Sequence, residues 1–336
     1  MILDIDNTIK DTVLGSFAAD TKLWQVAHKH VEIQSDLMQV STWVDDNNMM
    51  VNCDKYLRLP VGHKAGSEPA PYHANNNDVI TDQEHVKDLG IYISSDFTFD
   101  YHITNMVGRG EAVASWILRT FTTRDQYPIS ILLKTLLVPT LEYGCVLWNP
   151  NSGHLRELIE NVQKRFTSRI SIFNEINEET GLLQCTTNYW ERLKILKIYS
   201  LERRRERYII LFMYKIITKL YPNPGFDLSS IVFNERGEVR MDPKFDPRAP
   251  SWVKRLRTAS IFSKGPRLLE TVLPYLGGMA CLTNPAPNVV DFKEKLDKVL
   301  VTIPDEPTVP GLTANMRPAL SNSILDQIRH GNPTPV

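Results

Sequence analysis

The sequence has few cysteines and no apolar run long enough to cross a bilayer. The four cysteines, at positions 53, 145, 185 and 281 of 336, stand singly and without a C-x-x-C spacing. Structural zinc sites and disulfide frameworks need grouped cysteines, so this pattern indicates a reducing compartment without either. The acidic N-terminal segment also lacks the features of a signal peptide. We therefore expect an intracellular protein of the cytoplasm or nucleus, neither secreted nor membrane-bound.

Charge is unevenly distributed although the net charge is only −1. Residues 1–100 contain 7 Lys and Arg against 16 Asp and Glu, whereas residues 101–220 contain 17 against 11. A basic region of this kind is a candidate for binding a polyanion. The alternative is an ordinary solvated helix surface, and charge alone does not separate the two.

Hydrophobic spacing predicts an α+β chain with four regions. The first region, residues 1–100, should contain a hairpin within 1–25, a helix over 26–48 and strands at 49–59 and 86–99. Residues 101–220 have the period of consecutive amphipathic helices, and Pro139 should end or kink one of them. Residues 221–303 should form a small extension, and residues 304–336, rich in Pro, Thr, Asn and Ser, should lack a packed core.

One short motif suggests phosphatase chemistry. The stretch LDIDNTI matches the D-x-D-x-T pattern of haloacid-dehalogenase-type phosphatases, with Asp4 as nucleophile and Asp6 as acid–base. That chemistry needs a buried strand before the motif, and only three residues precede Asp4. The rest of the sequence predicts helices rather than an alternating β–α array, so a magnesium-dependent phosphatase is the least favoured alternative.

A second stretch, SFAADTKLW at residues 16–24, resembles the FADDTKL turn of reverse transcriptases from LINE-type (non-LTR) retrotransposons. Later segments resemble further blocks of jockey-like and chicken-repeat-like elements, in the same order along the chain: 43–59, 86–103, 132–150, 158–170, 189–216, 262–276 and 289–307. The resemblance implies a partial palm over 1–100, a helical thumb over 101–220 and a C-terminal extension over 221–303. The fingers and the first half of the palm would lie upstream of the hairpin.

The resemblance also implies RNA-directed DNA synthesis with two Mg²⁺ ions held by three carboxylates. Ala19 stands where the family has its principal aspartate, and Asp20 matches the second, vestigial one. Mg²⁺ requires several oxygen ligands, and a methyl group supplies none. We therefore expect a degenerate reverse transcriptase that is inactive and binds no specific metal. Lys55 matches a lysine near the incoming triphosphate in that family.

The helices after the hairpin grip a primer–template duplex in that family. The matching basic residues are Lys164, Arg165, Arg169, Arg203, Arg204, Arg205 and Arg207, with a third cluster at Lys254, Arg255 and Arg257. Such side chains would contact phosphates without reading sequence, so binding to RNA or an RNA–DNA duplex should be weak and salt-dependent. A non-catalytic binding module is thus an alternative to the enzyme. The sequence indicates no protein partner.

Overall fold

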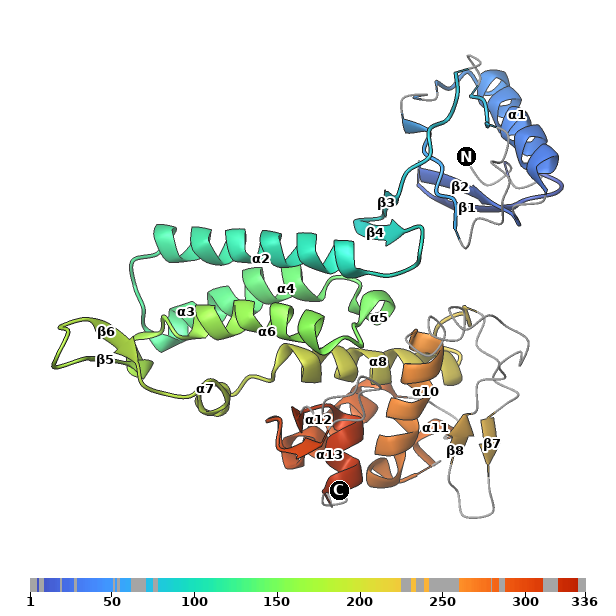
Figure 1. The fold of residues 1–336 in the computed structure, drawn as a ribbon. Coiled ribbons are helices and arrows are strands. Elements are labelled where there is room, and N and C mark those ends of the chain that lie inside the picture. The colour runs from blue at the N-terminus through green and yellow to red at the C-terminus, as the bar shows by residue number, and fades with distance from the viewer. Residues whose placement is uncertain are drawn as a thin grey trace. The chain divides into compact units, whose positions relative to one another are not determined.

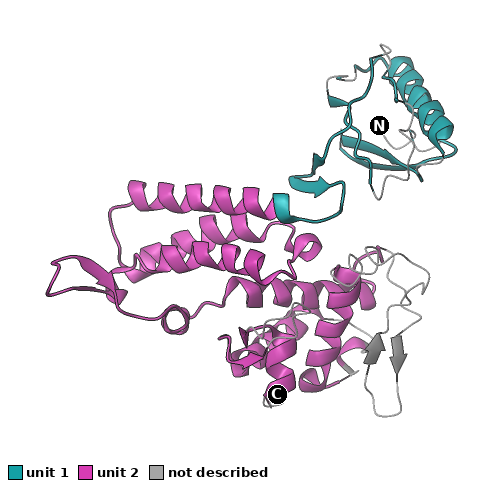
Figure 2. Ribbon diagram, viewed as in Figure 1, with its two compact units in different colours: residues 1–101 teal, residues 102–336 magenta. Residues whose placement is uncertain are grey.

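The computed structural model describes residue 5 and residues 9–18, 20–26, 29–50, 52, 55–61, 71–74, 78–224, 260–278, 281–282, 288–310 and 320–331, with the backbone of 231–233, 239–241 and 280–283. The chain forms two compact units, residues 1–101 and 102–336 (Figure 2). Helices and two-stranded antiparallel sheets make up the described parts, so the fold class is α+β. Among the described residues no helix combines the length and apolar character of a membrane span.

The first unit contains the expected hairpin and helix. Strands β1 (Val13–Phe17) and β2 (Asp20–Trp24) pair antiparallel, and Phe17 lies opposite Asp20. Helix α1 (His30–Asp46) buries its apolar stripe, including Trp43, against half-buried residues of the hairpin. Strands β3 (His85–Asp88) and β4 (Ile91–Ser94) form a second hairpin. The expected strand at 49–59 is not formed in its described part, where Arg58 makes only an isolated bridge to Asp82.

A buried carboxylate joins the first hairpin to α1. Asp36 accepts hydrogen bonds from the backbone N–H groups of Lys10, Asp11 and Thr12, at 3.4, 3.1 and 2.7 Å. Burial acts to raise the pKa of Asp36, but the hydrogen bonds outweigh it and leave the pKa lowered. The charged form of Asp36 therefore holds the segment before β1 on the helix.

The second unit is mainly helical (Figure 1). Its first part contains α2 (Asp100–Thr120), α3 (Gln126–Leu132), η3 (Leu133–Leu137), α4 (Val138–Glu142), α5 (Cys145–Trp148), α6 (Gly153–Thr167), η4 (Ser171–Phe173), β5 (Asn174–Ile176), β6 (Leu183–Cys185), α7 (Tyr189–Leu196) and α8 (Leu201–Ile217). Its second part contains β7 (Ile231–Phe233), β8 (Val239–Met241), α10 (Ile261–Val272), η6 (Leu273–Leu276), α11 (Ala280–Thr283), α12 (Val289–Thr302), β9 (Val309–Pro310), β10 (Leu320–Ser321) and α13 (Ile324–His330).

Pro139 changes the helix without ending it at that point. The proline has no N–H to donate to the carbonyl four residues earlier, and the preceding turn, η3, widens to a π-helix. The chain then continues as α4 and stops at Glu142, and Gly144 adopts a φ of +66° before α5 begins. The sequence thus located the irregularity correctly but not its form.

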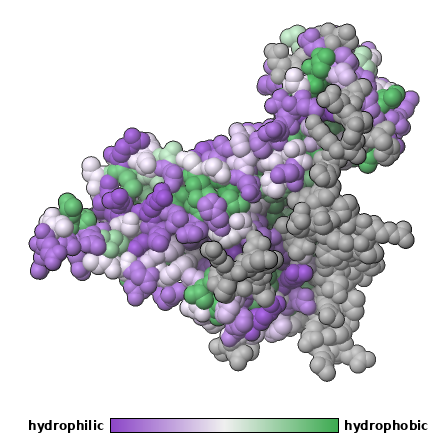
Figure 3. Space-filling model, viewed as in Figure 1, coloured by the Kyte–Doolittle hydropathy of each residue, from purple (hydrophilic) through white to green (hydrophobic). Residues whose placement is uncertain are grey.

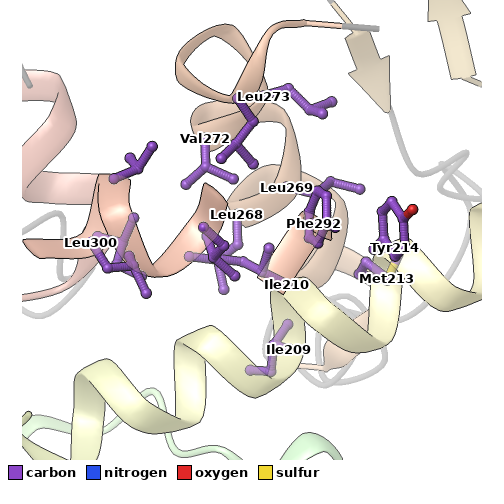
Figure 4. Packing of buried hydrophobic residues seen from close by; sticks show 14 of the residues in the cluster. Ile209, Ile210, Met213, Tyr214, Leu268, Leu269, Val272, Leu273, Phe292 and Leu300 are labelled. Atoms are coloured by element: carbon purple, nitrogen blue, oxygen red, sulfur yellow. The ribbon is translucent and has the colours of Figure 1, made fainter. Parts of the chain in front are cut away.

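Helix α8 lies at the centre of the second unit and is buried on most of its surface. Figure 4 shows its residues Ile209, Ile210, Met213 and Tyr214 packed with residues of α10 and α12. The rings of Tyr214 and Phe292 stack with centroids 3.9 Å apart. Each fully buried large apolar side chain of this kind contributes roughly 1.5–3 kcal/mol. The face seen in Figure 3 is largely hydrophilic, with apolar areas over the helices of this unit.

The C-terminal segment differs from the expectation for residues 304–336. Its described residues, 304–310 and 320–331, fold against the second unit, and Ile324 is fully buried in the core cluster. The amide of Gln327 donates to the carbonyls of Glu306 and Ser321, both at 2.8 Å. Polar side chains of this segment bind charged groups of α8. The polar composition of residues 304–336 therefore does not indicate the lack of packing that we expected from the sequence.

Candidate nucleic-acid interface

The turn of the first hairpin is tight and exposed. Phe17 and Asp20 form the last pair before it, and Ala18 has a φ of +51°, the left-handed conformation that two-residue hairpin turns require. Asp20 and Lys55 are both exposed. Ala19 lies outside the described residues, as do Asp4, Asp6 and the cluster at 254–257. Within the described part of the chain, no three His, Cys, Asp or Glu side chains group as metal ligands.

Arg203 does not lie on the surface, contrary to the sequence-based expectation for a phosphate contact. Its side chain is fully buried, and its guanidinium donates to the carbonyls of Leu300, Ile303, Pro304 and Asn322, at 3.3, 3.2, 2.6 and 3.3 Å. Arg203 therefore fastens the end of α12 and the C-terminal segment to α8. It is not available to a nucleic acid.

Arg205 is also fully buried. The sequence-based expectation of a surface phosphate contact is therefore wrong for this residue too. Its Nε donates to Asn149 Oδ1 at 3.1 Å, and its charge acts on the nearby carboxyl of Glu160. Glu160 accepts hydrogen bonds from the Tyr189 hydroxyl and from the backbone N–H of Leu201 at 3.1 Å. Burial nevertheless raises the pKa of Glu160 to about 7.

The two glutamates of α8 are buried, and they accept hydrogen bonds from residues outside α8 rather than from the neighbouring arginines. Glu202 accepts from Arg156 at 2.6 Å. Glu206 accepts from the Ser323 hydroxyl and the Ile324 N–H, both at 2.7 Å, where it caps the start of α13. The LERRRER stretch is therefore mostly a structural network, because α8 is a central helix rather than a surface one.

Arg204 and Arg207 remain partly exposed but are tied in bidentate ion pairs. Arg204 binds both carboxylate oxygens of Glu142, with the Nη2 to Oε2 distance at 2.9 Å. Arg207 binds both oxygens of Asp297 at 2.5 and 2.7 Å. Bidentate pairing fixes the guanidinium planes. Both arginines also line a cleft beside α8.

The basic residues at the end of α6 are where the sequence-based expectation places them. Lys164, Arg165 and Arg169 are all exposed, while the opposite face of α6 packs Ile159, Phe166 and other apolar residues in the core. Arg165 pairs with Glu111 of α2 at 2.7 Å, and these side chains are 73% and 47% exposed. An exposed pair of this kind is worth less than about 1 kcal/mol, so a phosphate can compete for Arg165.

Sequence reasoning missed the cleft beside α8, which has a volume of about 490 Å³. Lys134 of η3, Lys197 at the end of α7 and Lys293 of α12 line it together with Arg204 and Arg207. These lysines are spread over 160 positions and form no motif. Their convergence follows from tertiary packing alone, so no pattern in the sequence could have indicated it.

Comparison with known proteins gives a single weak likeness to report. Uncharacterized protein B0403.1 of Caenorhabditis elegans is 26% identical over 162 residues, which is 48% of this chain and 77% of that protein. No family model matches the sequence, and no solved structure matches it. The likeness assigns no family and no function, so any functional conclusion depends on the residues themselves.

Proposed function

We propose that the chain derives from a non-LTR retrotransposon reverse transcriptase and that it binds RNA or an RNA–DNA duplex without catalysis. The observation that carries the binding proposal is the exposure of Lys164, Arg165 and Arg169 at the end of α6. Exposed cations at the C-terminal end of a helix are available to phosphates, whereas Arg203 and Arg205 are not.

The proposed lack of polymerase activity depends on the turn at residues 17–20. Asp20 supplies one carboxylate, and the methyl group of Ala19 stands where the resemblance implies the principal metal ligand. Mg²⁺ loses its hydration shell reluctantly and needs several protein or substrate oxygens in octahedral geometry. Loss of one ligand from a two-metal site costs on the order of a thousandfold in rate, and this turn retains only one carboxylate.

Primer extension tests this part of the proposal. The purified chain should add no nucleotides to a DNA primer on an RNA template in Mg²⁺, and neither should the Ala19→Asp variant, because one restored carboxylate does not complete a two-metal site. Extension by the native chain that disappears in Asp20→Asn would refute the assignment of an inactive remnant.

Fluorescence anisotropy of a labelled RNA–DNA duplex tests the binding part. At low salt the native chain should bind, and the combined variant Lys164→Gln, Arg165→Gln, Arg169→Gln should bind at least tenfold more weakly, because each lost phosphate contact removes counterion release. The matched control changes three other exposed cations, Arg267, Lys298 and Arg329, to Gln and removes the same charge. Equal weakening in both variants would show that net charge, and not the end of α6, holds the duplex.

A further inference from the structure

The cleft beside α8 concentrates positive charge that its own residues leave unbalanced. Lys134, Lys197 and Lys293 all line it, and none of their ammonium groups has an ion-pair partner among the described residues. The two arginines that also line the cleft are each neutralised by one carboxylate, Glu142 or Asp297. Three positive charges are therefore in excess at one site.

Helix α8 contributes Arg204, Arg207 and Tyr208 to the cleft and is anchored at its start. The Nη2 of Arg204 lies 3.4 Å from the Tyr208 hydroxyl, and both belong to α8. The side chain of Ser200 caps the start of α8. The hydroxyl and the backbone N–H of Ser200 donate to the carboxylate of Asp305, at 2.7 and 2.6 Å. These contacts hold the α8 residues of the cleft in place before a ligand binds.

Two of the three lysines sit on uncommon backbone. Lys197 has a φ of +52° where it ends α7, and the N–H of Ile198 donates to the Leu193 carbonyl at 3.1 Å. Glycine is the usual residue in that position, and another residue costs about 1 kcal/mol there. Lys134 lies in the π-helical turn η3, a rare conformation often found at functional sites. Both irregularities present a lysine to the same cleft.

Neutral hydroxyls complete the polar lining. Burial, together with Asp297, raises the pKa of Tyr199, and burial together with Glu142 raises the pKa of Tyr208. Both tyrosines line the cleft and keep their protons at neutral pH, so they can donate hydrogen bonds to anionic oxygens. Ammonium groups and hydroxyl donors around one space are suited to a ligand with several phosphate oxygens.

We propose that this cleft binds a polyphosphate anion of two or three phosphate groups, as carried by a free nucleoside triphosphate or by the 5′-triphosphate end of an RNA strand. The volume falls within the range of about 300–1,000 Å³ that is usual for small-ligand sites. The excess of three charges suits a polyphosphate better than a single phosphate. The site is independent of the duplex surface on α6, because Lys164, Arg165 and Arg169 do not line it.

Isothermal titration calorimetry of the full chain with inorganic triphosphate, without metal, tests the proposal. The variants are Lys134→Gln, Lys293→Gln and Lys197→Asn, since asparagine tolerates a positive φ. Each should weaken binding about fivefold, and the combined variant by more than fiftyfold. Lys164→Gln is the matched control and should leave triphosphate binding unchanged. Far-UV circular dichroism should be native in all variants, because the changed side chains are exposed.

Absence of triphosphate binding by the native chain at low salt overturns the proposal, as does equal binding by the combined lysine variant with native circular dichroism. The affinities of three ligands distinguish the possible sources of the phosphates. These ligands are inorganic triphosphate, a nucleoside triphosphate and a short single-stranded RNA with a 5′-triphosphate. If the RNA with a 5′-triphosphate binds more tightly than the same strand with a 5′-hydroxyl, the ligand of the cleft is the 5′ end of an RNA strand. Equal affinities for the inorganic and nucleoside forms show that the phosphates alone are recognised.

Discussion

Replacing Arg203 by methionine should destabilise the second unit strongly. The guanidinium is fully buried and donates to the carbonyls of Leu300, Ile303, Pro304 and Asn322. It also lies 3.8 Å from Asp305, whose side chain is 17% exposed. Methionine keeps much of the volume but leaves these acceptors without their donor and Asp305 without its cation.

The expected cost follows from breaking a buried charged interaction, which removes about 3–5 kcal/mol of unfolding free energy. For a unit of this size the midpoint of thermal unfolding should fall on the order of 10 °C. The control is Arg165→Met, which breaks the exposed pair with Glu111 and should cost less than about 1 kcal/mol. Urea unfolding of both variants, followed by tryptophan fluorescence, measures the difference. Similar costs for the two variants would refute the structural role of Arg203.

Three further predictions test the packing and the buried charges. Gly110→Ala should lower the free energy of unfolding by about 1–3 kcal/mol, because its Cβ would lie 2.5 Å from the Leu141 side chain. The Cβ of Gly108→Ala meets nothing within 4 Å, so this variant should stabilise α2 by up to about 1 kcal/mol; urea unfolding measures both. Burial raises the pKa of Glu160 from 4.5 to about 7. The protonated carboxyl therefore contributes stability that is fully present below pH 4.5 and is lost as the pH rises through 7. Between pH 5 and 8 the free energy of unfolding should fall by roughly 2 kcal/mol more in the native chain than in Glu160→Gln. Ile324→Ala should cost about 2–4 kcal/mol in the same assay if the C-terminal segment is part of the core, and no measurable loss would contradict its packing.

The sequence predicted the elements with strong periodicity. The hairpin at the start, helix α1 and the series of helices after residue 100 follow from apolar spacing. The π-turn before Pro139 and the ordered C-terminal segment were not predictable in the same way. Pro139 indicates an irregularity but not that it takes the form of a π-turn, and the C-terminal segment is held by residues distant in sequence, such as Gln327 binding the carbonyl of Glu306.

The site could be predicted only in part. Lys164 and Arg165 lie on the polar face of the amphipathic helix α6, and Arg169 lies in the turn after it, so their exposure follows from the pattern. The LERRRER stretch has the same composition as a surface helix, and no local signal shows that Arg203 and Arg205 are buried. The acceptors of Arg203 come from α12 and the segment after it, and the acceptor of Arg205 is Asn149, in the loop before α6. The lysine-lined cleft depends on the same long-range packing.

The salt dependence of duplex binding tests the central claim most directly. If Lys164, Arg165 and Arg169 each neutralise one phosphate, a plot of log K against log salt should have a slope of about −2 to −3, equivalent to a loss of about fortyfold between 50 and 200 mM. The combined α6 variant should bring that slope close to zero, and the matched control at Arg267, Lys298 and Arg329 should keep it. A native slope that persists in the α6 variant would show that the duplex, if bound at all, is held elsewhere.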